Sequence, residues 1–121
     1  MPCVLIVEDD EQVRVLAEAI LHDAGYRTVS AATVPEALAL LQGDITVEAI
    51  FTDLHLVENG PGGIELTTEA RNILPKVKVL YTTGEGITDG TKALMVEGSA
   101  FLREPYTPDD LTAAIAALFG G

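Results

Sequence analysis

The segment Ala49–Asp53 reads AIFTD, an apolar run that ends in a single carboxylate. Isoleucine, phenylalanine and threonine all favour β-strands. The turn-rich stretch ENGPGG follows a few residues later, at residues 58–63. A strand, an acid and a glycine-rich loop in this order predict that Asp53 stands at the C-terminal edge of a central strand, where open α/β sheets carry their chemistry.

Further strands and helices alternate along the chain. Apolar runs of strand length occupy residues 4–7, 26–31, 77–82 and 100–102. Helical periodicity or capping signals lie between and after them, at residues 13–24, 33–41, 64–74, 87–97 and 107–119. Five strand–helix units at this spacing predict an α/β fold, a five-stranded parallel sheet with helices on both faces.

Composition narrows the class of protein. The chain of 121 residues is long enough for one domain with its own core, and we expect a single domain over residues 1–121 with no output domain. Its formal net charge of -12 argues against binding to nucleic acid or to anionic membranes. One cysteine, Cys3, no leader and no membrane-length apolar run favour a reducing, cytoplasmic location.

Parallel strands end at one edge of a sheet, so residues distant in sequence should meet there. Glu8 and Asp9 follow the first strand, Asp53 ends the third, Thr83 ends the fourth and Glu104 follows the fifth. Carboxylates in one cleft repel one another unless a cation joins them, and Mg²⁺ suits oxygen ligands. A metal beside a free carboxylate, with a hydroxyl nearby, could support transfer of a phosphoryl group onto that carboxylate.

Four motifs in order give a resemblance to a known family. They are VLIVEDD at residues 4–10, IFTDL at 50–54, LYTTG at 80–84 and EGSAFLREPY at 97–106. Over essentially its full length the chain resembles a receiver domain of bacterial two-component response regulators. The resemblance implies a flavodoxin-like sheet with strand order 2-1-3-4-5.

The resemblance also implies roles for the acidic residues. Asp53 would accept a phosphoryl group from the phosphohistidine of a sensor histidine kinase. Asp9 would bind Mg²⁺ directly, and Glu8 would do so directly or through water. The backbone carbonyl of His55 would supply a further ligand. The protein would then be a stand-alone signalling protein rather than an enzyme, catalysing only its own phosphorylation and dephosphorylation.

Two further residues would form the switch. By resemblance, Thr83 would bind a phosphoryl oxygen and Phe101 would rotate inward as Thr83 moves, shifting populations on the surface of the last two units. From the residues alone, Phe101 is equally well read as part of the core. A nucleotide-binding enzyme of the same architecture is disfavoured, because residues 8–10 are acids where a pyrophosphate needs glycines and amides.

Glu104 departs from the family pattern, which usually has a lysine just before the proline. A carboxylate there repels a phosphoryl group, by roughly 3 kcal/mol at ~5 Å and an effective dielectric of about 20. Arg103 should point away from the cleft, because side chains alternate along an extended segment. Glu104 could instead join the metal site, or pair with Arg103 or Lys92. We expect phosphorylation with altered switching; the alternative is a degenerate receiver, an interaction module that does not use phosphate.

The last predicted helix has no charged residue between Leu111 and Gly121. Its core face repeats at helical spacing through Leu111, Ala114, Ile115 and Leu118. The other residues form a small-residue apolar face: Thr112, Ala113, Ala116, Ala117 and Phe119. Such a face on an acidic protein predicts a homodimer through residues 111–119. The alternative is a solvent-exposed, alanine-rich helix.

Overall fold

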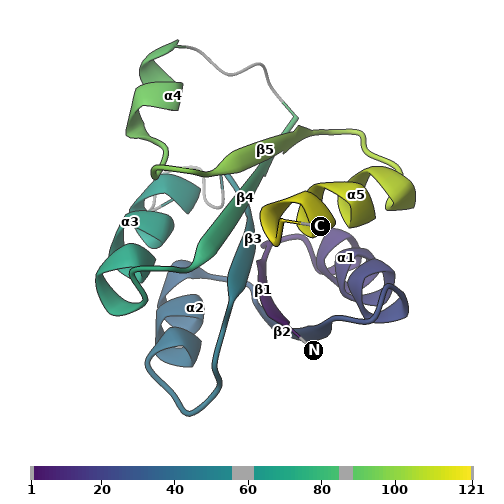
Figure 1. Ribbon diagram of the computed structural model, residues 1–121, viewed down its shortest axis with the longest axis horizontal. Helices are drawn as coiled ribbons and strands as arrows, with labels where there is room; N and C mark the ends of the chain where they lie inside the picture. The colour runs from purple at the N-terminus through teal and green to yellow at the C-terminus, as the bar shows by residue number, and fades with distance from the viewer. Residues whose placement is uncertain (1, 56–61, 85–88, 121) are drawn as a thin grey trace.

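The sheet follows the predicted order. A computed structural model describes residues 2–55, 62–84 and 89–120. Its five parallel strands lie in the order β2-β1-β3-β4-β5 (Figure 1). They are β1 (Cys3–Val7), β2 (Arg27–Ala31), β3 (Ala49–Asp53), β4 (Lys78–Thr83) and β5 (Ala100–Arg103). The α/β fold class and the strand order 2-1-3-4-5 are therefore confirmed.

Helices cover both faces of the sheet (Figure 1). They are α1 (Glu11–Asp23), α2 (Val34–Leu41), α3 (Gly63–Ile73), α4 (Asp89–Leu94) and α5 (Pro108–Leu118). The helices α2 and α3 pack on one face, over a core that includes Leu5, Ile50 and Val79. On the opposite face α1 and α5 pack over Val4 and Phe51. Successive residues of a strand thus point into the cores on opposite faces of the sheet, as the two-residue period of a strand requires.

Side-chain caps fix where three helices begin. The Asp10 carboxylate accepts from the backbone amides of residues 12 and 13 and starts α1. The Thr33 hydroxyl accepts from the Glu36 amide at the start of α2. For α5 the cap is Thr107, paired with Asp110 in a capping box. These caps satisfy amides that have no partner inside the helix. None of the described helices is long and apolar enough to cross a membrane.

Helix α4 is shorter than residues 87–97, the range that the sequence predicts. It ends at Leu94 and buries none of its residues, and Leu94 itself is 65 % exposed; residues 87 and 88 lie outside the described part of the chain. Gly90 weakens a helix that has no buried face to stabilise it. The segment that follows is held by the buried Tyr81, whose hydroxyl accepts from the Val96 amide at 3.2 Å and shares a 2.6 Å hydrogen bond with Thr67.

The core face of α5 agrees with the sequence, but one outer residue does not. Leu111 and Ile115 are buried, whereas Ala113 and Ala117 are exposed. Phe119 was predicted on the outer face; instead its ring packs on the core and stacks on Tyr26 with centroids 5.9 Å apart. Phe119 lies just past the last helical residue, so the helical period no longer sets its direction.

Candidate functional site

Three carboxylates meet at the edge of the sheet where the strands end. Glu8 follows β1, Asp53 ends β3 and Glu104 follows β5. One carboxylate oxygen from each lies within 4.8 Å of the other two. Glu8 is only 7 % exposed, while Asp53 and Glu104 are half-buried. Three acids this close, partly shielded from water, repel one another when they are ionised.

Asp53 is held by its own backbone surroundings. Its Oδ1 accepts a 2.9 Å hydrogen bond from the His55 amide. Burial raises the pKa of the Asp53 carboxyl; the His55 amide opposes this shift, and the charges of Glu104 and Asp9 reinforce it. A hydrogen bond to the charged form favours ionisation, whereas burial and like charges disfavour it.

Gly63, the first residue of α3, lies against the backbone at the end of β3. Its amide donates to the Leu54 carbonyl at 3.0 Å. A Cβ atom at Gly63 would collide with the backbone oxygen of Asp53 and lie 3.1 Å from the Leu54 Cα. Only glycine therefore allows α3 to begin this close to Asp53.

Glu8 is the most buried acid of the site. Burial is the main cause that raises its pKa to about 8, and a hydrogen bond with the Asp9 side chain adds to the shift. The Asp10 amide donates to Glu8 Oε2 at 3.1 Å and opposes it. Asp9 is exposed and lies outside the three-carboxylate cluster, although it stays beside Glu8.

Glu104 points into the site rather than away from it. The Thr82 hydroxyl donates to Glu104 Oε1 at 3.3 Å, and the Glu104 amide donates to the Thr83 carbonyl at 2.9 Å. The peptide bond between Glu104 and Pro105 is cis. Arg103 is exposed, as strand alternation predicts. Of the alternatives that the sequence leaves open for Glu104, the geometry favours a place among the carboxylates.

The two proposed switch residues occupy different environments. Thr83 is buried at the end of β4, opposite Arg103 in the register with β5. Phe101 is 40 % exposed on β5, so its alternative reading as a core residue is wrong. β5 is the edge strand of the sheet, and Phe101 belongs to neither hydrophobic core. The roles of Thr83 and Phe101 in switching stay predictions.

Sequence reasoning overlooked Tyr106 as a neighbour of the site. Its ring meets Phe51 edge-on with centroids 6.0 Å apart. Burial, reinforced by the charges of Glu104, Glu8 and Asp53, raises the pKa of the Tyr106 hydroxyl to about 12. Its place after the last strand was visible in the sequence, but the direction of its side chain was not.

Comparison with known families identifies this arrangement. The family model described as response regulator receiver domain matches residues 4–116. The chain belongs to this family. Among curated relatives, this receiver domain is 30 % identical over 114 residues to the alginate biosynthesis transcriptional regulatory protein AlgB of Pseudomonas aeruginosa, covering 93 % of the chain and 25 % of the relative. It is also 30 % identical to the uncharacterized transcriptional regulatory protein YrkP of Bacillus subtilis, and the match covers 94 % of the chain and 48 % of the relative.

Solved structures agree in fold. A CheY-like receiver domain protein from Methanospirillum hungatei matches the receiver domain with a TM-score of 0.86 and 26 % identity, covering 99 % of this chain and 95 % of the other. A second match is a Burkholderia pseudomallei response regulator with a phosphorylated aspartic acid, a calcium ion and citrate. Its TM-score is 0.80 and its identity 27 %, and the match covers 94 % of this chain and 66 % of the other. The chain spans between a quarter and about half of the length of the two curated relatives.

Proposed function

We propose that this receiver domain accepts a phosphoryl group on Asp53 from a histidine kinase and signals by binding a partner protein. The observation that carries the proposal is the position of Asp53: it is half-buried at the end of β3, within 4.8 Å of two other carboxylates. A Burkholderia pseudomallei relative of the same fold has a phosphorylated aspartic acid together with a divalent cation, which supports the same use of this edge of the sheet.

The acids of the site fit a hard divalent cation. Glu8 and Asp53 offer carboxylate oxygens close enough to share one ion, Glu104 lies within the same distance, and exposed Asp9 follows Glu8 in the chain. Mg²⁺ prefers such oxygen ligands and keeps several waters. When bound, it would neutralise charge on an incoming phosphoryl group. We propose that Mg²⁺ is held by Glu8, Asp9 and Asp53, with the His55 carbonyl as the backbone ligand.

The two oxygens of Asp53 then have separate tasks. Oδ1 is occupied by the His55 amide, which fixes the plane of the carboxylate. The other oxygen, Oδ2, would attack the phosphorus atom as the bond from phosphorus to the kinase histidine nitrogen breaks. The product is an acylphosphate on Asp53. Thr83 would hold one phosphoryl oxygen, and Phe101 would leave its exposed position as Thr83 moves.

The transfer can be tested with a small-molecule phosphodonor in place of the kinase. We expect acetyl phosphate with Mg²⁺ to add the mass of one phosphoryl group to the purified protein, and a chelator to prevent the addition. Asp53→Asn should abolish the addition because the nucleophile is lost. Asp44→Asn is the matched control, since Asp44 is an exposed loop acid that should not affect it.

The same experiment separates the two functions that the site allows. Glu104 brings a negative charge to the place that a phosphoryl group would occupy. No Mg²⁺-dependent acylphosphate in the wild type would refute the proposal. The receiver domain would then be an interaction module that works without phosphorylation.

We also propose that the protein acts in the cytoplasm and self-associates through α5. Cys3 is a free, buried thiol, which suits a reducing compartment. The outer face of α5 is apolar and small, with Ala113 and Ala117 exposed and Thr112 and Ala116 half-buried. A second copy would cover this face, which carries no charge to oppose contact.

A further inference from the structure

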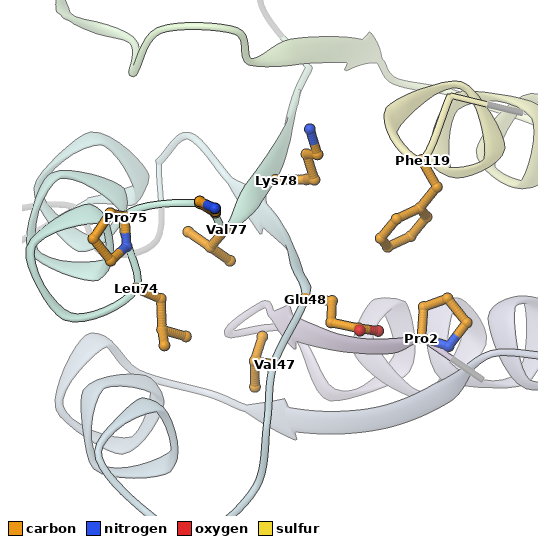
Figure 2. A pocket seen from close by; sticks show the side chains of 9 residues that line it. Pro2, Val47, Glu48, Leu74, Pro75, Val77, Lys78 and Phe119 are labelled. Carbon is orange, nitrogen blue, oxygen red and sulfur yellow. The ribbon is translucent and has the colours of Figure 1, made fainter.

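A cavity of about 470 Å³ lies at the opposite edge of the sheet, where the strands begin. We call it the strand-start cavity. Four separate segments line it: Pro2, residues 47–48, residues 74–78 and Phe119 (Figure 2). Pockets of roughly 300–1,000 Å³ are typical of sites for small molecules. The strand-start cavity is therefore large enough for a ligand with an aromatic ring or a short hydrocarbon chain.

The walls of the strand-start cavity are mostly apolar and firmly placed. Val47 and Val77 are each 3 % exposed and form its floor, in the core between the sheet and helices α2 and α3. Pro2, Leu74 and Phe119, which are half-buried, and exposed Pro75 supply its open apolar surface. The Phe119 ring reaches in from the α5 side, opposite Val77 and Leu74 (Figure 2), and its stacking on Tyr26 fixes its position. Such walls favour an apolar ligand body, because contact removes apolar surface from water.

The charges around the strand-start cavity differ from those of the rest of the molecule. Lys76 and Lys78 line it, and the Arg71 side chain donates to the Val77 carbonyl at 2.9 Å beside it. These are three of only seven basic residues in a chain of net charge -12. Among the described lining residues Glu48 is the one acid, and its carboxylate accepts from the Cys3 amide at 3.2 Å. The cations thus outnumber the acid in the strand-start cavity.

We propose that the strand-start cavity binds a small carboxylic acid with an aromatic or aliphatic body. The apolar body would pack on Pro2, Leu74 and Phe119, whose side chains are only partly buried, and the carboxylate would face Lys76 and Lys78. The site is separate from Asp53: the strand β3 that connects the two edges has five residues, or roughly 16 Å at about 3.3 Å per residue. The proposal therefore does not rest on phosphorylation of Asp53.

A pair of matched probes can test for both parts of this ligand. Naphthoate has an apolar body with a carboxylate, and naphthamide has the same body without the charge. In amide NMR titrations of the full chain we expect naphthoate to shift the signals of residues 47, 48, 77, 78 and 119. Exposed ion pairs are weak, so naphthoate should bind only about three- to tenfold more tightly than naphthamide, which is about 0.7–1.4 kcal/mol.

Charge-reversal variants locate the carboxylate. Lys78→Glu should remove the preference for naphthoate over naphthamide, because Lys78 is an exposed residue that lines the strand-start cavity. Lys92→Glu makes the same change in net charge on α4, outside the strand-start cavity, and should leave the preference intact. The amide spectrum of each variant shows that it is folded.

Three results would overturn the proposal. One is equal affinity for the two probes, and another is a set of shifts that is not confined to the strand-start cavity. The third is an equal loss of binding in Lys78→Glu and Lys92→Glu, since this would reflect net charge alone. Shifts at the same five amides that grow with protein concentration, without any probe, would assign the strand-start cavity to a second copy of the chain instead.

Discussion

Glu104 and Asp53 place two carboxylates at short range, and their repulsion would act on a phosphoryl group if Asp53 is phosphorylated as proposed. Their oxygens lie within 4.8 Å of each other. Two unit charges at about 5 Å with an effective dielectric near 20 repel by about 3 kcal/mol. Both side chains are partly exposed to water, which lowers the repulsion below this value. A phosphoryl group on Asp53 would add to the negative charge that Glu104 faces.

Replacing Glu104 by lysine should reverse this interaction. We expect Glu104→Lys to lengthen the lifetime of the Asp53 acylphosphate by tenfold or more, because a cation can bridge the phosphoryl group and the acceptor. Glu104→Gln, which removes the charge without reversing it, should give an intermediate lifetime. Loss of the phosphoryl group is followed by mass spectrometry after the phosphodonor is removed. An unchanged lifetime together with an unchanged phosphorylated structure would contradict the role given to Glu104.

Glu8 should make stability depend on pH when no metal is bound. Its pKa is raised from an ordinary 4.5 to about 8 in the folded protein. Between these pH values the folded state keeps a proton that the unfolded chain releases. The stability that the protonated Glu8 side chain contributes is complete below pH 4.5 and is lost as the pH rises through 8. Each unit of pKa difference contributes about 1.4 kcal/mol.

Urea unfolding in the presence of a chelator measures this effect. The free energy of unfolding should fall between pH 5 and pH 8 more steeply in the wild type than in Glu8→Gln, which cannot titrate at this position. Added Mg²⁺ should stabilise the wild type more at pH 8 than at pH 5, because cation and proton compete for Glu8. Parallel profiles for the two proteins would show that Glu8 ionises normally.

At the level of elements, the start of α3 packs directly against the backbone of Asp53. A methyl group at Gly63 would collide with the backbone of Asp53 and Leu54, neither of which can move freely. We expect Gly63→Ala to lower the free energy of unfolding by about 1–3 kcal/mol. It should also slow phosphorylation, because Asp53 must shift. At Gly43 an added Cβ meets only carbonyl oxygens at 3.5 and 3.6 Å, so Gly43→Ala is the matched control.

Denaturant unfolding and the rate of acylphosphate formation test both consequences. If Gly63→Ala matched Gly43→Ala in stability and in the rate of acylphosphate formation, the close approach of α3 to β3 would matter for neither.

The strands were predictable from sequence because β1, β3 and β4 are apolar runs buried on both faces. Helix α4 was predicted too long, because a helix without a buried face leaves little periodicity to find its ends. The positions of the strand ends also predicted that the carboxylates at positions 8, 53 and 104 would meet at one edge of the sheet. Sequence could not give the direction of Glu104, the close approach of Gly63 or the walls of the strand-start cavity. Each of these depends on contacts between segments far apart in the chain.

At the scale of the whole molecule, α5 should control the oligomeric state. Sedimentation equilibrium at micromolar concentration should give a dimeric mass for the wild type and a monomeric mass for Ala117→Glu, which places a charge on the exposed face. Ala19→Glu adds the same charge on an exposed position of α1 and should leave the dimer intact. Because each protomer carries a net charge of -12, the dimer should tighten as salt is added. A monomeric wild type would refute the dimer.

The inward direction of the Glu104 side chain also has a consequence for the motion expected if Asp53 is phosphorylated as proposed. A lysine at this position, as the family usually has, would be drawn toward a phosphoryl group on the acceptor. Glu104 is pushed away instead and would lose its hydrogen bond from Thr82. Because Glu104 directly follows β5 and precedes α5, the push would open the junction between them. In this receiver domain the signal would be an outward displacement driven by repulsion.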